Sequence, residues 1–318
     1  MVMNVFLLIG GFVLLILGAD YLVKGAASIA RYFNIRTLVI GLTVVAFGTS
    51  APELVVNLFS ALSGSNELAV ANILGSNISN ILLILGVAAL ITPLAVHRGT
   101  VWKEIPFSLL AAIILVVLGF DVFFGMGAGN YLTRGDGIVL LGFFAIFLYY
   151  TFGMSKAEGE HGDRVETYPI WKSILFALAG LVGLVLGGKF IVDSGVDIAR
   201  TFGVSEHLIG VTIVAVGTSL PELATAIMAA IRKHVDLAIG GIIGSNIFNI
   251  FFVLGVTSIV SPLGFVQSAL QDGLVVVAVT FALFLSMFLG KKHHLQRWTG
   301  GLFVLGYIAY ITLSIIRG

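Results

Sequence analysis

This chain is a succession of apolar stretches, each about as long as a lipid bilayer is thick, with mostly short polar breaks between them. Of its 318 residues, 58% are hydrophobic and 10% are charged, and the mean hydropathy is +1.10. Soluble globular domains lie far from these values, so we expect an integral membrane protein in contact with the lipid bilayer. The net charge is +1 and the basic residues are scattered, which predicts no nucleic-acid partner. The sequence has no cysteine, which excludes thiol nucleophiles and thiolate metal sites.

The apolar stretches predict ten membrane-spanning helices, if about 20 apolar residues make one span. The expected fold is an all-α integral membrane protein with turn-rich breaks between helices and one long hydrophilic connector at residues 155–169. The helices are predicted at residues 3–33, 38–62, 68–91, 102–120, 133–152, 171–202, 207–231, 236–260, 270–289 and 298–316.

Lysine and arginine near the helix ends predict the orientation, because cytoplasmic loops are enriched in both residues. With ten spans, thirteen Lys or Arg residues fall on one side of the membrane and four on the other. The four are Arg134, Lys189, Arg200 and Arg317. We therefore expect both termini to be extracellular and the connector to be cytoplasmic.

The chain also contains a repeat. The segment "IGLTVVAFGTSAPE" (40–53) aligns without a gap on "IGVTIVAVGTSLPE" (209–222), and the same offset places "GSNISN" (75–80) on "GSNIFN" (244–249). One register over this length indicates a duplicated half, with halves at residues 1–154 and 170–318. Each half holds five predicted helices, an odd number, so the second copy should enter the bilayer from the opposite side. Two inverted five-helix repeats are typical of secondary transporters with a site at the midplane.

Charged residues inside the predicted helices need partners, since a charge at the centre of the membrane costs roughly 2.5–3.5 kcal/mol even on the lenient insertion scale. Asp20 has Lys24 one turn further on, and at the matching place in the second half Lys189 has Asp193. We expect both to be structural pairs at i,i+4 spacing.

Glu53 and Glu222 end the repeated motifs "GTSAPE" and "GTSLPE", and neither has a Lys, Arg or His within a helical turn. Each needs an external cation, a proton or a partner on another helix. Each also follows a proline, Pro52 or Pro221, whose missing N–H and bulky ring disturb the preceding turn. Carbonyls freed in this way are tolerated at mid-membrane only where protein or a wet cavity satisfies them.

Further oxygen-bearing side chains surround the two glutamates in the sequence. They lie three residues before each glutamate or at i,i+4 spacing in the two GSNxxN segments: Ser50, Ser219, Ser76, Asn80, Ser245 and Asn249. Carboxylate, carbonyl, hydroxyl and carboxamide oxygens are the ligands of Ca²⁺ and also suit Na⁺. Close packing and interhelical hydrogen bonding are the alternative for the glycines, serines and asparagines. Packing does not require an unpaired acid, so the glutamates favour a cation site.

The doubled motifs, "GTSAPE" with "GSNISN" and "GTSLPE" with "GSNIFN", resemble the alpha repeats of the calcium/cation antiporter superfamily, most closely the prokaryotic sodium/calcium exchangers. The resemblance implies ten helices in two inverted halves. It also implies four ion positions, arranged as a diamond between the second, third, seventh and eighth helices.

The resemblance implies the following ligands by motif position. Ca²⁺ would bind centrally to the carboxylates of Glu53 and Glu222 and to the carbonyls of Thr49 and Thr218. The flanking Na⁺ positions would use Ser50, Ser76 and the carbonyl of Ala46 on one side, and Ser219, Ser245 and the carbonyl of Ala215 on the other. Asn80 and Asn249 would line the middle of the diamond.

The expected function is exchange of Na⁺ for Ca²⁺ by alternating access in the plasma membrane of a prokaryote. The protein would act as a monomer, without cofactor and not as an enzyme, with both ions as transported substrates. Some relatives, including potassium-dependent exchangers, carry an aspartate where Asn249 stands, so K⁺ co-transport is not expected. The short connector leaves no room for calcium-sensing regulatory domains.

Three other functions fit parts of the pattern. A proton-coupled cation exchanger is the nearest, since a buried glutamate can carry H⁺ as well as bind metal. An intramembrane enzyme could use two glutamates as acid and base, although equal copies of one motif suit a two-sided pathway better. A channel is the third alternative.

Overall fold

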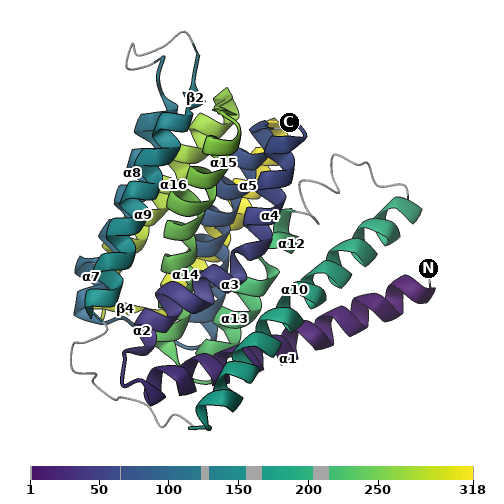
Figure 1. The fold of residues 1–318 in the computed structure, drawn as a ribbon, viewed down its shortest axis with the longest axis vertical. Coiled ribbons are helices and arrows are strands. Elements are labelled where there is room, and N and C mark those ends of the chain that lie inside the picture. The colour runs from purple at the N-terminus through teal and green to yellow at the C-terminus, as the bar shows by residue number, and fades with distance from the viewer. Residues whose placement is uncertain (1, 65, 123–128, 155–166, 203–214, 318) are drawn as a thin grey trace.

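The computed structural model describes residues 2–64, 66–122, 129–154, 167–202 and 215–317, and it is predominantly helical (Figure 1). Eight helices in these ranges are long and apolar enough to cross a membrane, or nine if one bent pair counts as a single span. The predicted helices agree with the observed ones to within a few residues at most ends. The first part of the helix predicted at 207–231 and most of the connector predicted at 155–169 lie outside the described residues.

The elements of the first half, in which η marks a π-helical segment, are α1 (Val2–Tyr32), α2 (Thr37–Ile40), η1 (Gly41–Val45), α3 (Ala46–Thr49), α4 (Ala51–Leu62), α5 (Asn66–Ser79), η2 (Asn80–Leu85), α6 (Gly86–Ile91), β1 (Leu94–Ala95), α7 (Arg98–Trp102), α8 (Glu104–Gly119), β2 (Tyr131–Leu132) and α9 (Arg134–Met154). Those of the second half are α10 (Ile170–Thr201), α12 (Ala215–Thr218), α13 (Leu220–Ile231), α14 (Val235–Ile247), η4 (Phe248–Leu254), α15 (Gly255–Val260), β3 (Leu263–Gly264), α16 (Gln267–Ser286), β4 (His294–Leu295) and α17 (Arg297–Arg317).

Two continuous spans form the centre of the bundle. Residues Asn66–Ile91 (α5, η2 and α6) and Val235–Val260 (α14, η4 and α15) have 78% and 94% of their most apolar windows buried, whereas no other long span exceeds 39%. Both spans contain a π-helical segment, which begins at Asn80 in the first and at Phe248 in the second. The wider π-turn is often found at functional sites. In both central spans it begins at or beside an asparagine of a GSNxxN motif.

The helices that carry the glutamates are broken where the prolines predict. The segments Thr37–Thr49 and Ala51–Leu62 meet at a bend of 43°. The break falls at Ser50, with φ −84° and ψ 2°, and the corresponding break between α12 and α13 falls at Ser219, with φ −88° and ψ 3°. Pro52 and Pro221 occupy the first turn of the following helix, where their missing N–H costs nothing.

The long helices α1 and α10 pack against each other and cross at one side of the bundle (Figure 1). Glycines bring their backbones into contact. A Cβ on Gly18 would lie 2.7 Å from the backbone nitrogen of Leu184, and a Cβ on Gly180 would lie 2.4 Å from that of Leu22. Small residues at a helix interface allow this close approach in membranes.

Two short antiparallel ribbons are the part of the fold that the all-α prediction missed. Leu94 pairs with Leu295 in the ribbon of β1 and β4, and Leu132 pairs with Leu263 in the ribbon of β2 and β3. The two ribbons lie toward opposite ends of the bundle (Figure 1). One strand of each ribbon begins at the leucine of a Pro-Leu pair, Leu94 or Leu263. Strands of two residues are too short to produce a periodic pattern in the sequence.

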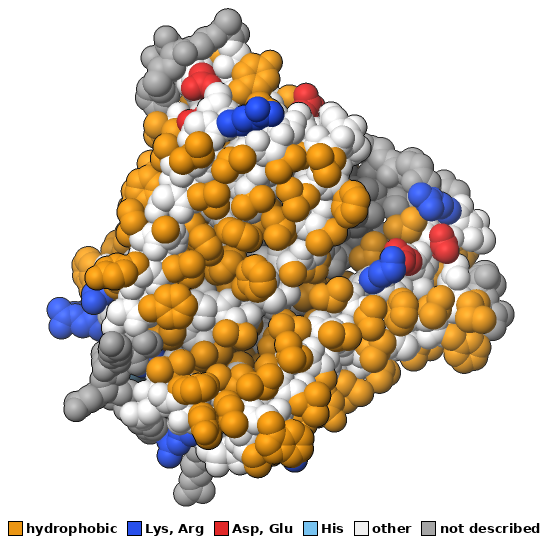
Figure 2. Space-filling view, in the orientation of Figure 1, with side chains coloured by type: hydrophobic (Ala, Val, Ile, Leu, Met, Phe, Trp, Pro, Cys, Tyr) orange, Lys and Arg blue, Asp and Glu red, His pale blue; other side chains and the backbone are white. Residues whose placement is uncertain are grey.

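The outer surface is apolar. Figure 2 shows hydrophobic side chains over most of one face, with the charged side chains at its margins. Large side chains such as Phe6, Ile138 and Leu305 are well exposed on membrane-length helices. A soluble protein rarely exposes so much contiguous apolar surface, which agrees with the predicted contact with lipid.

Candidate cation site

Glu53 and Glu222 are both buried, with 0% and 2% of their surfaces exposed. Each lies in the first turn of the helix that follows the break, α4 or α13. The N-terminal end of a helix favours a negative charge, which makes this a suitable position for a carboxylate. Among the described residues neither glutamate forms an ion pair.

Serine hydroxyls join the two halves of the chain around these carboxylates. The Oγ atoms of Ser50 and Ser245 share a hydrogen bond of 2.6 Å, and both lie within hydrogen-bonding distance of Oε1 of Glu222, at 3.4 and 3.2 Å. Two of these three contacts recur around the other glutamate, with longer distances. Ser219 donates to Ser76 at 3.5 Å, and Ser76 donates to Oε1 of Glu53 at 3.5 Å.

Asn80 and Asn249 complete the group, and both are fully buried. Nδ2 of Asn80 donates to Ser245 at 3.4 Å, and Nδ2 of Asn249 donates to Ser76 at 3.2 Å. The structure therefore places eight of the predicted side chains together. We call them the oxygen cage: Glu53, Glu222, Ser50, Ser219, Ser76, Ser245, Asn80 and Asn249.

Four buried oxygens of the oxygen cage accept no hydrogen bond from any residue that the structure describes. They are Oε2 of Glu53, Oε2 of Glu222, Oδ1 of Asn80 and Oδ1 of Asn249. A buried polar atom needs a partner, and these four oxygens could coordinate an ion or accept from water. Two carboxylate and two carboxamide oxygens, in matching positions of the two motifs, form a donor set suited to a hard cation.

The predicted backbone ligands lie on the helical turns just before the breaks. Thr49 ends α3, and its hydroxyl donates to the carbonyls of Val45 at 3.0 Å and Ala46 at 3.4 Å. The Ala46 carbonyl also accepts the N–H of Ser50 at 3.0 Å. In the second half, Ala215 begins α12 and Thr218 ends it. All four residues are thus within about two turns of a glutamate.

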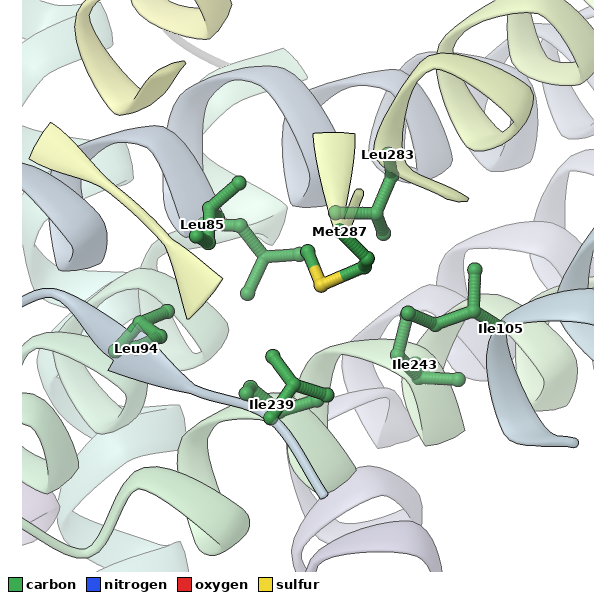
Figure 3. A pocket seen from close by; sticks show the side chains of 9 residues that line it. Leu85, Leu94, Ile105, Ile239, Ile243, Leu283 and Met287 are labelled. Atoms are coloured by element: carbon green, nitrogen blue, oxygen red, sulfur yellow. The ribbon is translucent and has the colours of Figure 1, made fainter. Parts of the chain in front are cut away.

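A narrow crevice reaches the oxygen cage on the side of Glu222. Thr49, Glu222 and Thr225 supply its polar wall, and the remaining lining is aliphatic. A second small hollow is lined only by apolar side chains (Figure 3). It is lined by Leu85, Leu94, Val96, Ile105, Ile239, Ile243, Leu283, Met287 and Leu295.

Sequence reasoning did not single out Asn77 and Asn246, although both are buried and both contact the oxygen cage. Asn80 donates to Oδ1 of Asn246 at 2.8 Å, and Asn249 donates to Oδ1 of Asn77 at 3.1 Å. The signal was present, since each is the third letter of a GSNxxN segment and the two stand 169 positions apart, like the glutamates.

Both predicted structural ion pairs form. Lys24 lies 2.7 Å from Asp20, and Lys189 lies 3.4 Å from Asp193. Asp20 has an additional partner that the sequence pattern did not predict, because Arg232, just after α13, also forms an ion pair with it. This contact ties α1 to the element that carries Glu222.

A buried cage of oxygens inside a bundle of membrane-length apolar helices defines a cation-handling membrane protein. Comparison with known proteins identifies the family. The model of the sodium/calcium exchanger protein family matches residues 3–153 and 172–316. The chain belongs to this family; it is a cation antiporter, and not an enzyme.

Relatives match along most of the chain or nearly all of it. The sodium/calcium exchanger MaX1 of Methanosarcina acetivorans is 30% identical, covering 98% of both chains. The inner membrane protein YrbG of Escherichia coli (strain K12) is 38% identical, covering 80% of this chain and 79% of its own. A solved structure of the sodium-calcium exchanger NCX_Mj, soaked with 10 mM Na⁺ and no Ca²⁺, is 34% identical with a TM-score of 0.85, covering 98% of both chains.

Proposed function

We propose that this protein exchanges Na⁺ for Ca²⁺ across the plasma membrane of a prokaryote, by alternating access at the oxygen cage. The observation that carries the proposal is the set of four buried, unpartnered oxygens on Glu53, Glu222, Asn80 and Asn249. A site built only from oxygen, with two acidic residues, favours Ca²⁺ and Na⁺ over softer metals.

The proposed ligands follow the motif positions. Ca²⁺ is held by the carboxylates of Glu53 and Glu222 and the carbonyls of Thr49 and Thr218. The flanking Na⁺ positions use the hydroxyls of Ser50, Ser76, Ser219 and Ser245 with the carbonyls of Ala46 and Ala215. Asn80 and Asn249 lie between them. The contacts of the serines with the glutamates support this arrangement.

The charge of the site couples the transport of Na⁺ to that of Ca²⁺. Two carboxylates balance one Ca²⁺, and ligands shared with Na⁺ force the two ions to compete. A site without any cation would leave two uncompensated anions in a medium of low polarity, which is costly. The protein should therefore change its access state only with one kind of ion bound.

The proposed architecture has ten membrane helices in two inverted halves, at residues 1–154 and 170–318, joined by a cytoplasmic connector at 155–169. Both termini are extracellular and the monomer is the functional unit. The contact of Ser50 with Ser245 has a counterpart in the contact of Ser219 with Ser76. The offset that aligns the repeated motifs relates the two contacts, which supports the two-fold arrangement.

Uptake of ⁴⁵Ca²⁺ into proteoliposomes tests the proposal. Vesicles loaded with Na⁺ and diluted into Na⁺-free buffer should accumulate ⁴⁵Ca²⁺, and vesicles with a pH gradient but no Na⁺ should not. Uptake driven by the pH gradient alone would instead identify a proton-coupled exchanger. A K⁺ gradient added to the Na⁺-loaded vesicles should change nothing.

A further inference from the structure

A cation can use only the oxygen of an asparagine side chain, because the NH₂ group of the carboxamide is a donor and has no acceptor capacity. A carboxamide has two orientations, which exchange the positions of its oxygen and its NH₂ group. Asn80 and Asn249 can therefore contribute a ligand to the oxygen cage only in the orientation that points Oδ1 toward the ion. What fixes the NH₂ group decides which atom faces the ion.

Both NH₂ groups are fixed by hydrogen bonds. Nδ2 of Asn80 donates to Oδ1 of Asn246 at 2.8 Å and to Ser245 at 3.4 Å. Nδ2 of Asn249 donates to Oδ1 of Asn77 at 3.1 Å and to Ser76 at 3.2 Å. Each NH₂ group thus has two acceptors, while the two Oδ1 atoms accept nothing from the described part of the chain.

Both bonds of each pair go to the opposite half of the molecule, and the shorter one goes to an asparagine. Asn246 on α14 holds Asn80, and Asn77 on α5 holds Asn249. Both holding residues are almost completely buried, with 1% and 0% of their surfaces exposed. Asn77 also donates to the backbone carbonyl of Asn246 at 3.3 Å, so the two holding residues are themselves linked.

We propose that Asn77 and Asn246 are positioning residues of the cation site. Each accepts from the NH₂ group of a middle asparagine in the opposite half, and so turns the oxygen of that asparagine toward the ion. This inference rests on the proposed function, because it assumes that the oxygen cage binds cations. It predicts that the acceptor oxygen of each residue does the positioning, while the NH₂ group of Asn77 contributes only by linking Asn77 to Asn246.

Replacement by alanine and by aspartate tests this inference in the full-length protein. N77A and N246A remove the acceptor and should raise the Ca²⁺ concentration at half-maximal uptake roughly fivefold, the factor that corresponds to one hydrogen bond of about 1 kcal/mol. Asn246→Asp keeps an acceptor oxygen and loses no hydrogen bond to a described residue, because Nδ2 of Asn246 has none there. It should therefore not raise that concentration. Asn77→Asp also keeps an acceptor oxygen, but it loses the bond to the Asn246 carbonyl. Its half-maximal Ca²⁺ concentration should therefore lie between those of the wild type and N77A.

Asn72→Ala is the matched control. Asn72 donates to Asn57 at 3.0 Å between α5 and α4, so this variant removes a similar asparagine pair on the same helix as Asn77 without touching the oxygen cage. It should leave the half-maximal Ca²⁺ concentration unchanged. If N77A and N246A lower only the maximal rate, as Asn72→Ala could, the two residues are merely structural and the proposal is overturned.

Binding separates a failure of this inference from a failure of the proposed function. Ca²⁺ added to purified wild-type protein should raise its thermal unfolding midpoint, since a ligand that binds only the folded state stabilises it. If the wild type binds Ca²⁺ but Na⁺ does not drive uptake, the proposed coupling fails. Positioning is then still supported if N77A and N246A need more Ca²⁺ than the wild type for the same rise in the unfolding midpoint. If the wild type does not bind Ca²⁺, both proposals fall.

Discussion

The hydroxyls of Ser50 and Ser245 lie 2.6 Å apart although 195 residues separate them in the chain. The corresponding pair, Ser219 and Ser76, is separated by 3.5 Å. The hydrogen-bond network is therefore tighter around Glu222 than around Glu53, which makes the two sides of the oxygen cage unequal.

The inequality predicts unequal effects of removing the serines. Ser245 donates to Glu222 at 3.2 Å and contacts both Ser50 and Asn80, so Ser245→Ala should raise the half-maximal Na⁺ concentration for Ca²⁺ exchange by about fivefold. Ser76 is the counterpart of Ser245 in the first half, and its longer contacts with Glu53 and Ser219, both 3.5 Å, predict a smaller shift for Ser76→Ala. Ion titrations of uptake measure both. Ser258→Ala is a control, since that hydroxyl donates to the Gly255 carbonyl of its own helix. Equal shifts for the two cage serines would contradict the inequality.

The glutamates should be indispensable. Glu53→Gln and Glu222→Gln keep the size and the hydrogen-bonding oxygen of the side chain but remove a charge that no base among the described residues balances. With one negative charge left, Ca²⁺ is no longer neutralised, and Na⁺-driven ⁴⁵Ca²⁺ uptake should fall at least about 100-fold in each variant, as expected for the loss of a buried charge interaction of several kcal/mol. Size-exclusion chromatography should show a folded protein in both cases.

Glu67→Gln provides the comparison, since Glu67 is an exposed acid in the first turn of α5. It should transport at the wild-type rate. Wild-type uptake in either Glu53→Gln or Glu222→Gln would refute the assignment of the site.

How far the sequence could predict this molecule depends on the range of the interactions involved. Apolar length places the helices, and the prolines predict the breaks at Ser50 and Ser219, because both effects are local. The unpaired charge of Glu53 and Glu222 indicates a cation site without any knowledge of packing. In contrast, the acceptor role of Asn77 and Asn246 requires that α5 and α14 meet in one particular register, which no local pattern gives.

The same limit applies to the charges. The pair of Asp20 and Lys24 is readable from i,i+4 spacing, but the contact of Asp20 with Arg232 joins two elements 212 positions apart. The π-helical segments that begin at Asn80 and Phe248 are similarly invisible, because their side chains have the ordinary composition of a buried helix.

The contact of α1 with α10 should be sensitive to a single methyl group. In Gly18→Ala the new Cβ would lie 2.7 to 2.9 Å from backbone atoms of Leu184, Gly180 and Gly183, and backbone cannot move aside as a flexible side chain can. Overpacking of this kind typically costs about 1–3 kcal/mol, so the thermal unfolding midpoint in detergent should fall.

Gly10→Ala is the control, because it makes the same change on the same helix where nothing lies within 4 Å of the new Cβ. It should not be destabilised, because alanine favours the helix. Equal midpoints for the two variants would show that the close approach is not maintained in solution.

The ion pair between Asp20 and Arg232 should hold α1 against the core of the bundle. Arg232→Gln removes the cross-element partner and leaves Asp20 with Lys24 alone, so we expect a loss of about 1 kcal/mol or less, given that the three side chains are partly exposed. Amide hydrogen exchange should rise near Asp20 on α1.

Lys189→Gln is the control, because Lys189 occupies the position in the second half that matches Asp20. Among the described residues Lys189 pairs only with Asp193 of its own helix, and the two side chains are 66% and 60% exposed. A pair so exposed contributes almost nothing, so this variant should exchange like the wild type. The same exchange near Asp20 in wild type and Arg232→Gln would mean that packing alone, through the glycines of α1 and α10, keeps α1 in place.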